Sequence, residues 1–188
     1  MICTDTDTRR EEEDRLPQRS AKSDRELSER DRWLQFLRAH AVRDIFAARF
    51  QFPTPESPSL RAFANVPEVS MPIRTDTGSE FAPDIVVVDT SRNQIKIHVA
   101  VETAHTVNEE AARHRWLPYS QLADSAFYLY VPVGYGRRAK RICRRLGIGV
   151  YGFRTWRYTP HGLEINEVSE RPGVINNILP AILKRLIR

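Results

Sequence analysis

The sequence predicts an α/β protein with a mixed central sheet flanked by helices, and three observations lead to this prediction. Residues 83–89 and 94–103 are two β-rich runs separated by a short polar turn, which is typical of a hairpin. After residue 108, helical and strand patterns alternate along the chain. Such alternation requires crossover connections, which add parallel strands to the sheet and place helices on its faces. The chain has 188 residues, 41% of them hydrophobic, enough for one domain with a sizeable core.

The two ends of the chain differ from its middle. Residues 1–23 are polar, mixed in charge and nearly free of apolar side chains, so we expect a disordered tail. We expect residues 24–170 to form a single domain and residues 171–188 to form a C-terminal amphipathic helix interrupted by Pro180. No stretch approaches the ~18 apolar residues of a membrane span, and no apolar signal segment begins the chain. These observations predict a cytoplasmic protein without membrane contact.

The first predicted element is a long amphipathic helix that ends near Phe50. Ser23 is a candidate N-cap, and Glu26 completes a capping box. Apolar residues then recur at steps of three, four and seven, and Trp33 and Phe36 widen this stripe. The stripe consists of Leu27, Leu34, Leu37, Ala41, Ile45 and Ala48.

A Pro-, Ser- and Thr-rich stretch follows the helix, with one short strand predicted around residues 68–73. The run 83–89 is almost continuously β-branched, as expected of a strand buried on both faces. Residues 94–103 alternate in character, so their side chains should point to opposite faces of the sheet. One face should carry Ile95, Ile97, Val99 and Val101, and the other Lys96, His98, Ala100 and Glu102.

The second half of the chain is predicted to contain two more helices and three more strands. Asn108 is a candidate cap for a helix that runs through Trp116, with Pro118 bending it. Gly147 is a candidate C-cap for the second helix. That helix covers residues 137–146, and the strands cover 126–133, 148–156 and 163–168.

Two carboxylates fall at positions that the hairpin brings together. Asp84 opens the first strand, directly after Pro83, and Glu102 ends the second. In a hairpin the start of one strand neighbours the end of the next, so with strand spacings of ~5 Å these acids should lie within about 8 Å. Two close carboxylates repel unless a cation such as Mg²⁺ lies between them.

At these residues the chain resembles the PD-(D/E)xK superfamily of restriction-endonuclease-like nucleases, over roughly residues 80–156. Pro83-Asp84, the hairpin, the acid after an alternating strand and the helices and strands that follow carry the resemblance. It implies a restriction-endonuclease-like core and Mg²⁺, with Mn²⁺ as a substitute. By position, Asp84 and Glu102 would be the catalytic metal ligands, and the backbone carbonyl of Thr103 would assist.

The chain departs from the superfamily pattern at the catalytic lysine. Ala104 occupies that position, and sliding the register by two residues places Glu102 there instead. Lys96, His105 and Arg113 are candidate substitutes for the lysine. Glu80, four residues before Asp84, is a candidate extra carboxylate.

A basic helix is the second functional signal. Its apolar stripe is Ala139, Ile142, Cys143 and Leu146, and no acid occurs between Asp124 and Glu164 to neutralise its other side. A concentrated positive surface attracts phosphates, and arginine binds them in bidentate fashion. The candidate nucleic-acid-binding residues are Arg137, Arg138, Lys140, Arg141, Arg144 and Arg145, and Arg113, Arg115, Arg154 and Arg157 are candidates for extending the patch.

The remaining conspicuous residues are predicted to be structural. Cys3 and Cys143 are an improbable disulfide, and the five histidines lack zinc-site spacing. Most of the aromatic residues are expected to pack in the core rather than stack on bases. They are Trp116, Tyr119, Phe127, Tyr128 and Tyr130.

The sequence therefore predicts a nucleic-acid-processing protein that hydrolyses phosphodiesters with a metal, DNA being favoured over RNA. The alternative is a catalytically inactive nuclease-like domain that acts as a nucleic-acid-binding or protein-assembly module. The missing lysine favours this alternative, and the tail or the C-terminal helix would contact a protein partner. A third hypothesis is a scaffold whose basic helix binds an acidic protein.

Overall fold

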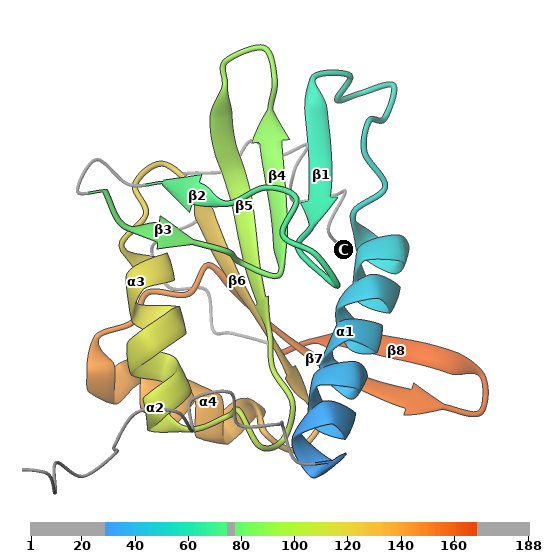
Figure 1. Cartoon of the computed structure of the whole chain (residues 1–188), viewed down its shortest axis with the longest axis vertical. Coiled ribbons are helices and arrows are strands. Elements are labelled where there is room, and N and C mark those ends of the chain that lie inside the picture. Colours follow the sequence, from blue (N-terminus) through green and yellow to red (C-terminus); the bar gives the residue numbers. More distant parts are fainter. Residues whose placement is uncertain (1–28, 75–77, 169–188) are drawn as a thin grey trace, which may run out of the picture.

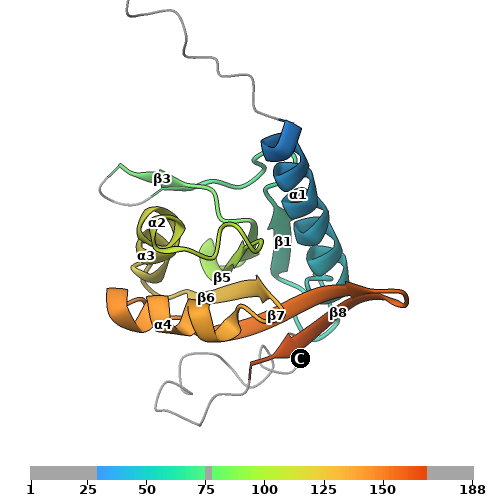
Figure 2. The ribbon, with the colours of Figure 1, turned by 90° about the horizontal axis from the view of Figure 1, so that it is seen from below.

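A curled, mixed sheet of six strands forms the centre of the computed structural model, which describes residues 29–74 and 78–168. The sheet has the shape of a half-barrel, with helices on both faces (Figures 1 and 2). Its strands are β1 (Leu60–Ala64), β4 (Ile85–Asp89), β5 (Gln94–Val101), β6 (Ala126–Pro132), β7 (Gly152–Thr159) and β8 (Gly162–Glu167). The predicted α/β class with a mixed sheet is confirmed.

The helices and a small second sheet complete the fold. A two-stranded ribbon, β2 with β3, lies beside the hairpin of the main sheet (Figure 1). The ribbon strands are β2 (Ile73–Arg74) and β3 (Glu80–Phe81). The helical elements are α1 (Glu29–Arg49), α2 (Glu109–Ala111), the π-helix η1 (Ala112–Trp116), α3 (Leu117–Ser120) and α4 (Gly136–Leu146). α2, η1 and α3 follow one another directly and form one helical segment.

The order of strands in the sheet is β1-β4-β5-β6-β7-β8. β1, β4 and β5 are antiparallel to one another in turn, as are β7 and β8, whereas β5, β6 and β7 are parallel. The segment α2–η1–α3 and helix α4 are the two crossovers that the parallel strands require. The carboxyl ends of β5 and β6 therefore lie at the same end of the sheet.

The predicted hairpin is present, but its side-chain alternation contains a bulge. Val87 pairs with Ile97 whereas Val88 pairs with Ile95, so Lys96 is an extra residue in β5. The side chains of β5 that precede the bulge therefore point to the faces of the sheet opposite to those predicted. Ile95 consequently packs in the cluster of Val86, Val88 and Ile73, and not on the side of Ile97 as the sequence predicted.

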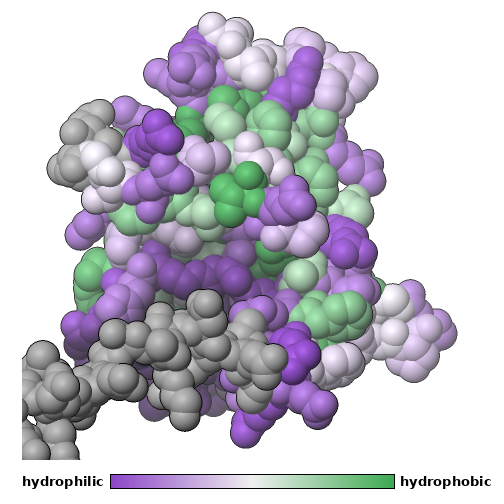
Figure 3. Space-filling view, in the orientation of Figure 1, coloured by the Kyte–Doolittle hydropathy of each residue, from purple (hydrophilic) through white to green (hydrophobic). Residues whose placement is uncertain are grey.

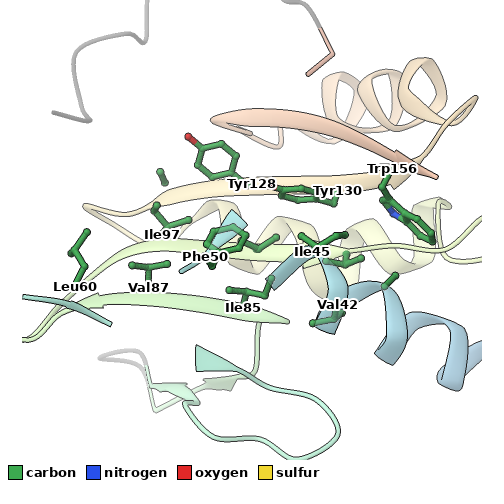
Figure 4. Packing of buried hydrophobic residues seen from close by; sticks show 14 residues of the cluster. Val42, Ile45, Phe50, Leu60, Ile85, Val87, Ile97, Tyr128, Tyr130 and Trp156 are labelled. Atoms are coloured by element: carbon green, nitrogen blue, oxygen red, sulfur yellow. The ribbon is translucent and has the colours of Figure 1, made fainter. Parts of the chain in front are cut away.

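Each face of the sheet has its own hydrophobic core. On one face α1 contributes Val42, Ile45 and other residues to a cluster with the central strands (Figure 4). On the other face η1 and α4 cover a second cluster that includes Trp116 and Ile142. The predicted structural role of the aromatic residues is confirmed, since Trp116, Tyr119, Phe127, Tyr128 and Tyr130 are all buried.

Helix α1 buries a narrower stripe than the sequence predicted. Ala41, Val42 and Ile45 are buried, but Trp33 and Phe36 are more than half exposed. At 100° per residue, the two rings lie on the opposite side of the helix from the buried residues, so they cannot widen the stripe. The helix ends where expected, while its predicted start at Ser23 lies outside the described residues.

Helix α4 follows its prediction closely. Ala139, Ile142 and the free thiol of Cys143 are buried, and Gly147 has the left-handed conformation of a C-cap with φ 66°. The Gly147 N–H donates to the Cys143 carbonyl, which ends the helix.

Two strand predictions are corrected. β1 at Leu60–Ala64 was not predicted, because its strand conformation depends on antiparallel pairing with β4 and not on local composition. The strand expected at 68–73 is reduced to the short strand β2. β7 begins at Gly152 and not at Ile148, because its parallel register places Gly152 opposite Tyr128. The predicted tail 1–23 and C-terminal helix 171–188 lie outside the described residues.

None of the helices in the described part of the chain combines the length and apolar character that crossing a bilayer requires.

Candidate functional site

Asp84 lies in the turn of chain that leads into β4, and the sheet fixes its orientation. Its backbone N–H donates to the Val99 carbonyl at 2.9 Å, so the residue extends the pairing of β4 with β5. Its carboxylate accepts from the backbone N–H of Val101, which is 2.7 Å from Oδ2. The side chain is 3% exposed. A carboxylate this deeply buried requires positive partners.

Glu102 follows the last residue of β5 and is completely buried. Its backbone N–H donates to the Tyr130 carbonyl of β6 at 2.9 Å. Two tryptophan indoles bind the same residue: Trp116 Nε1 donates to Oε1 at 2.7 Å, and Trp156 Nε1 donates to the backbone carbonyl at 3.2 Å. The glutamate is thus positioned by donors from both faces of the sheet.

A single guanidinium bridges the two acids. Arg115 Nη1 lies 3.0 Å from Oε1 and 3.2 Å from Oε2 of Glu102, and its Nη2 lies 3.0 Å from Oδ2 of Asp84. The convergence of Asp84 and Glu102 that the hairpin predicted is present in the structure. The cation between them is an arginine side chain that the sequence analysis had assigned to the basic patch.

Arg38 of α1 is the second cation of this cluster, and it was not predicted from the sequence. Its guanidinium binds Asp84 Oδ1, and its Nε donates to the Val101 carbonyl at 3.2 Å. The sequence does indicate that Arg38 is on the buried side of the helix, because it lies four residues after Leu34 and three before Ala41, within the apolar stripe. An arginine on the buried side of a helix needs an acidic partner. We refer to Arg38, Asp84, Glu102 and Arg115 as the acid–arginine cluster.

Burial and charge act in opposite directions on the ionisable groups of this cluster. Desolvation raises the pKa of Glu102 above its ordinary value, although the charge of Arg115 opposes the rise. Burial also disfavours the charged form of Arg115, but attraction to Asp84 and Glu102 outweighs it and raises the guanidinium pKa. With both acids ionised, two negative and two positive charges balance within the cluster.

The π-helical turn explains how two successive side chains reach the same carboxylate. Residues of an α-helix advance by 100°, which separates neighbouring side chains. The wider turn of η1 at Ala112–Trp116 directs both Arg115 and Trp116 toward Glu102. π-turns inside helices occur often at functional sites. No local sequence pattern announces this turn, so the predicted candidates for a basic group near the acids were Lys96, His105 and Arg113, and Arg115 was not among them.

The predicted metal ligands Asp84, Glu102 and Thr103 do not offer what Mg²⁺ requires. Magnesium needs oxygen ligands with free lone pairs in near-octahedral geometry. Both Asp84 oxygens and both Glu102 oxygens already accept hydrogen bonds from protein donors. The Thr103 carbonyl accepts from the backbone N–H and the hydroxyl of Thr106, at 3.2 and 3.3 Å. The donor set thus accommodates a guanidinium in place of a divalent ion.

The candidate substitutes for the missing lysine do not join the cluster. Lys96 donates to Gln94 near the start of β5, and Arg113 is an exposed partner of Glu109 at 3.9 Å. His105 is exposed, and its backbone carbonyl accepts from the side chain of Asn108. The candidate extra acid Glu80 is bound to Arg74 on the exposed ribbon.

The acid–arginine cluster is partly exposed to solvent on one face of the molecule. The side chains of Arg38 and Arg115 are 29% and 24% exposed, whereas their acidic partners are buried beneath them. Strongly hydrophilic residues gather near the centre of the face shown in Figure 3. The positive members of the cluster are therefore the ones that a ligand from solvent meets first.

The basic helix α4 is partly neutralised, in contrast to its prediction. Arg145 forms an ion pair with Glu109 of α2, because the fold brings these two helices together. Lys140 is half-buried, with its ammonium 5.3 Å from the centre of the Phe153 ring. The four other basic residues are exposed and form no ion pair within the described ranges: Arg137, Arg138, Arg141 and Arg144.

The predicted extension of the basic patch is largely wrong. Arg115 belongs to the acid–arginine cluster. Arg154 is buried, lies over the Tyr128 ring on the face opposite α4, and pairs with Glu167 at 2.9 Å. Arg157 pairs with Glu164 across the β7–β8 hairpin at 2.7 Å. Of the predicted patch, the four exposed arginines of α4 are the ones that form no ion pair within the described residues.

Comparison with models of known families, with curated proteins and with solved structures finds no match for this chain. The function is therefore inferred from the geometry of the acid–arginine cluster and from the charge of α4.

Proposed function

We propose that this chain is a nucleic-acid-binding module of the restriction-endonuclease-like type, in which the acid pair stabilises the fold instead of cleaving phosphodiesters. The observation that carries the proposal is the row of four exposed arginines on α4 that form no ion pair with any residue of 29–74 or 78–168. Arginine forms bidentate contacts with phosphate, and a row of such side chains follows a polyanionic backbone. DNA is the favoured nucleic acid, as the resemblance to DNA-cleaving enzymes suggests.

The acid–arginine cluster supports binding without cleavage. A metal-dependent nuclease needs carboxylates free to hold the ion that activates water. Here Arg115 donates to both Asp84 and Glu102, and Ala104 occupies the position of the usual lysine. The carboxylates therefore already have their counter-charge, and the side chain of Ala104 cannot polarise water as the usual lysine would.

The position of α4 also supports this function. Helix α4 begins four residues after β6 ends. Near that end of β6, the Tyr130 carbonyl accepts a hydrogen bond from the Glu102 backbone N–H, so α4 and the acid–arginine cluster lie at the same end of the sheet. α2, α4 and the first turns of α1 gather at this end of the molecule (Figure 1). A nucleic acid bound along α4 would pass close to the cluster.

The salt dependence of binding tests this proposal. We expect the chain to bind a labelled DNA oligonucleotide, and the double variant Arg137→Gln/Arg141→Gln to bind it more weakly. Each lost phosphate contact reduces the slope of log K against log salt by about 0.9, so the double variant should lower the slope by about 2. Fluorescence anisotropy at several salt concentrations measures this slope.

The matched control neutralises two exposed arginines away from α4, in Arg74→Gln/Arg92→Gln. These residues lie on the ribbon and in the β4–β5 turn, so the control should keep the salt slope of the unmodified chain. Equal slopes for both double variants would contradict α4 as the binding surface. Binding to an acidic polypeptide in preference to DNA would favour the scaffold hypothesis instead.

Metal-dependent hydrolysis is the second candidate function, and the convergence of Asp84 and Glu102 favours it. Under this alternative, Arg115 would have to leave the carboxylates when substrate and metal bind. Incubating DNA and RNA with the chain in Mg²⁺, Mn²⁺ or EDTA separates the two functions. Products that form only with metal and disappear in Glu102→Gln would establish a nuclease, whereas the binding module gives no products in any condition.

A further inference from the structure

Three aromatic rings form a ladder along the side of α1 that lies opposite its buried stripe, and the first two are exposed. Trp33 and Phe36 are stacked with their centroids 5.7 Å apart and their planes 21° apart. The His40 ring lies 4.4 Å from the Phe36 ring. The three residues are spaced by three and four positions, which places them on one side of the helix. We refer to Trp33, Phe36 and His40 as the ring ladder.

The two larger rings of the ladder are turned to solvent, although such rings usually contribute to a core. Trp33 is 57% and Phe36 is 52% exposed. The other two tryptophans, Trp116 and Trp156, are 0% and 9% exposed. Stacked, exposed rings on a helix that already buries its opposite side indicate a contact surface.

The surroundings of the ring ladder favour a polyanion over an apolar partner. Arg43 lies three residues after His40 and seven after Phe36, on the same side of α1, and it forms no ion pair within the described residues. Asp44, its neighbour, is bound by the Tyr158 hydroxyl at 2.6 Å, and Glu29 lies at the helix start. Rings next to a free guanidinium match a nucleic acid strand, which offers bases to the rings and phosphates to the arginine.

We infer that the ring ladder is a stacking platform for unpaired nucleobases, so that the nucleic acid crossing α1 is single-stranded. This inference rests on the proposed nucleic-acid-binding function and defines its ligand further. Aromatic side chains stack on any base, because every base has a flat π-face. The bases of a duplex stack on one another, so only a strand with unpaired bases can use the ladder.

The ring ladder and the acid–arginine cluster lie on opposite sides of the same stretch of α1. Arg38, which binds Asp84, is two residues after Phe36 and points to the opposite side of α1. The single strand would therefore pass over α1 at the end of the molecule where the cluster and α4 lie (Figure 1).

Tryptophan fluorescence of the full chain tests the inference directly, because Trp33 is the one tryptophan of the chain that is mostly exposed. The probes are an oligothymidylate and an abasic strand of the same length and charge. We expect the oligothymidylate to quench Trp33 emission and to bind at least about tenfold more tightly than the abasic strand, because only the former can stack. A single strand should also bind more tightly than the corresponding duplex.

The double variant Trp33→Ala/Phe36→Ala removes the two exposed rings of the ladder. It should bind the oligothymidylate and the abasic strand equally, while an unchanged melting temperature verifies that it is folded. The matched control Val69→Ala/Val133→Ala trims two other exposed apolar residues and should retain the preference for bases.

Several outcomes would overturn the inference. Equal binding of both strands by the unmodified chain would exclude stacking while leaving the proposed function intact, whereas binding of neither strand would contradict the proposed function itself. Trp33 emission that is shielded from acrylamide in the free chain would mean that another segment covers the ladder. A change of oligomeric state in Trp33→Ala/Phe36→Ala, with no change in strand preference, would assign the rings to an interface between copies of the chain.

Discussion

Arg115 is the residue on which the buried charges of this protein depend. It donates to both carboxylates of the acid–arginine cluster, and each of these carboxylates is almost completely removed from water. Removing one partner of a buried ion pair leaves an uncompensated charge and costs about 3–5 kcal/mol. The neighbouring donors Arg38 and Trp116 remain after such a removal, so part of the compensation would persist.

We predict that Arg115→Ala lowers the free energy of unfolding by about 3 kcal/mol. Arg115→Lys should lose less, because it retains the charge, but its compact ammonium lacks the planar fork with which the guanidinium spans two acids. Urea denaturation measures both values. The matched control is Arg113→Ala, whose side chain is exposed and whose pair with Glu109 should contribute less than about 1 kcal/mol. Equal losses at both positions would mean that the cluster does not stabilise the fold.

The acids of the candidate site could be predicted from the sequence, but the arginines between them could not. Strand alternation and the hairpin turn are local patterns, and they bring Asp84 and Glu102 together whatever surrounds them. The approach of Arg115 depends on a π-turn, which shifts the side chains of the helix and has no recognisable sequence signature. Arg38 was detectable as a charge in an apolar stripe, but its partner lies 46 residues away.

At the scale of elements, the packing of β7 on β6 depends on the absence of a side chain at Gly152. A Cβ atom there would lie 2.5 Å from Cε1 and 2.7 Å from Cδ1 of Tyr128, a buried ring of the first core. Both distances are far shorter than a van der Waals contact, and the ring has little room to move in a close-packed interior.

We therefore predict that Gly152→Ala destabilises the protein by about 1–3 kcal/mol, the typical cost of overpacking a core. Gly149→Ala is the matched control, because nothing lies within 4 Å of the added Cβ atom. That control should change stability by less than about 0.5 kcal/mol. Thermal unfolding of the two variants gives the comparison, and a fully stable Gly152→Ala would mean that β6 and β7 can separate without loss.

Elements with strong local signals were predicted well, and elements defined by pairing were not. α4 matches its prediction because an apolar stripe and Gly147 mark its face and its end. β1 has no β-branched run and is held as a strand only by β4, so its sequence resembles a loop. The exposure of Trp33 and Phe36 was missed because both rings are apolar, although the 100° advance per residue of a helix places them opposite the buried stripe.

At the scale of the whole molecule, stability should depend on pH through a buried histidine. His98 is completely buried, stacks on Phe127 and bonds the Tyr119 carbonyl through Nε2 at 2.9 Å. Burial lowers the pKa of His98 to about 4 from the ordinary 6.5. Between these values the unfolded chain takes up a proton that the folded chain does not, so stability decreases as the pH falls.

We predict that His98 alone removes about 3 kcal/mol of unfolding free energy between pH 6.5 and pH 4. Glu102 acts in the opposite direction, because its raised pKa lets the folded state accept a proton more readily than the unfolded state. Comparing the chain with His98→Gln by urea denaturation across this range isolates the histidine. Parallel pH profiles for the two proteins would contradict the prediction.

The fold class could be predicted because it follows from the order of elements. A hairpin followed by alternating helices and strands leaves few arrangements other than a mixed sheet with helices on its faces. The curl of the sheet and the division of the core between its two faces depend on side-chain volumes that are far apart in the sequence. These features emerge only when the whole chain is assembled.

The buried thiol of Cys143 gives this protein an internal reporter of helix detachment. The thiol lies beneath α4 against the sheet, and burial raises its pKa to about 12. A maleimide or disulfide reagent therefore cannot react with it while α4 is packed on the sheet. Labelling requires α4 to lift away. In a chain carrying Cys3→Ser, the labelling rate would therefore record how often the arginine-bearing helix leaves the sheet, and whether a bound strand holds it in place.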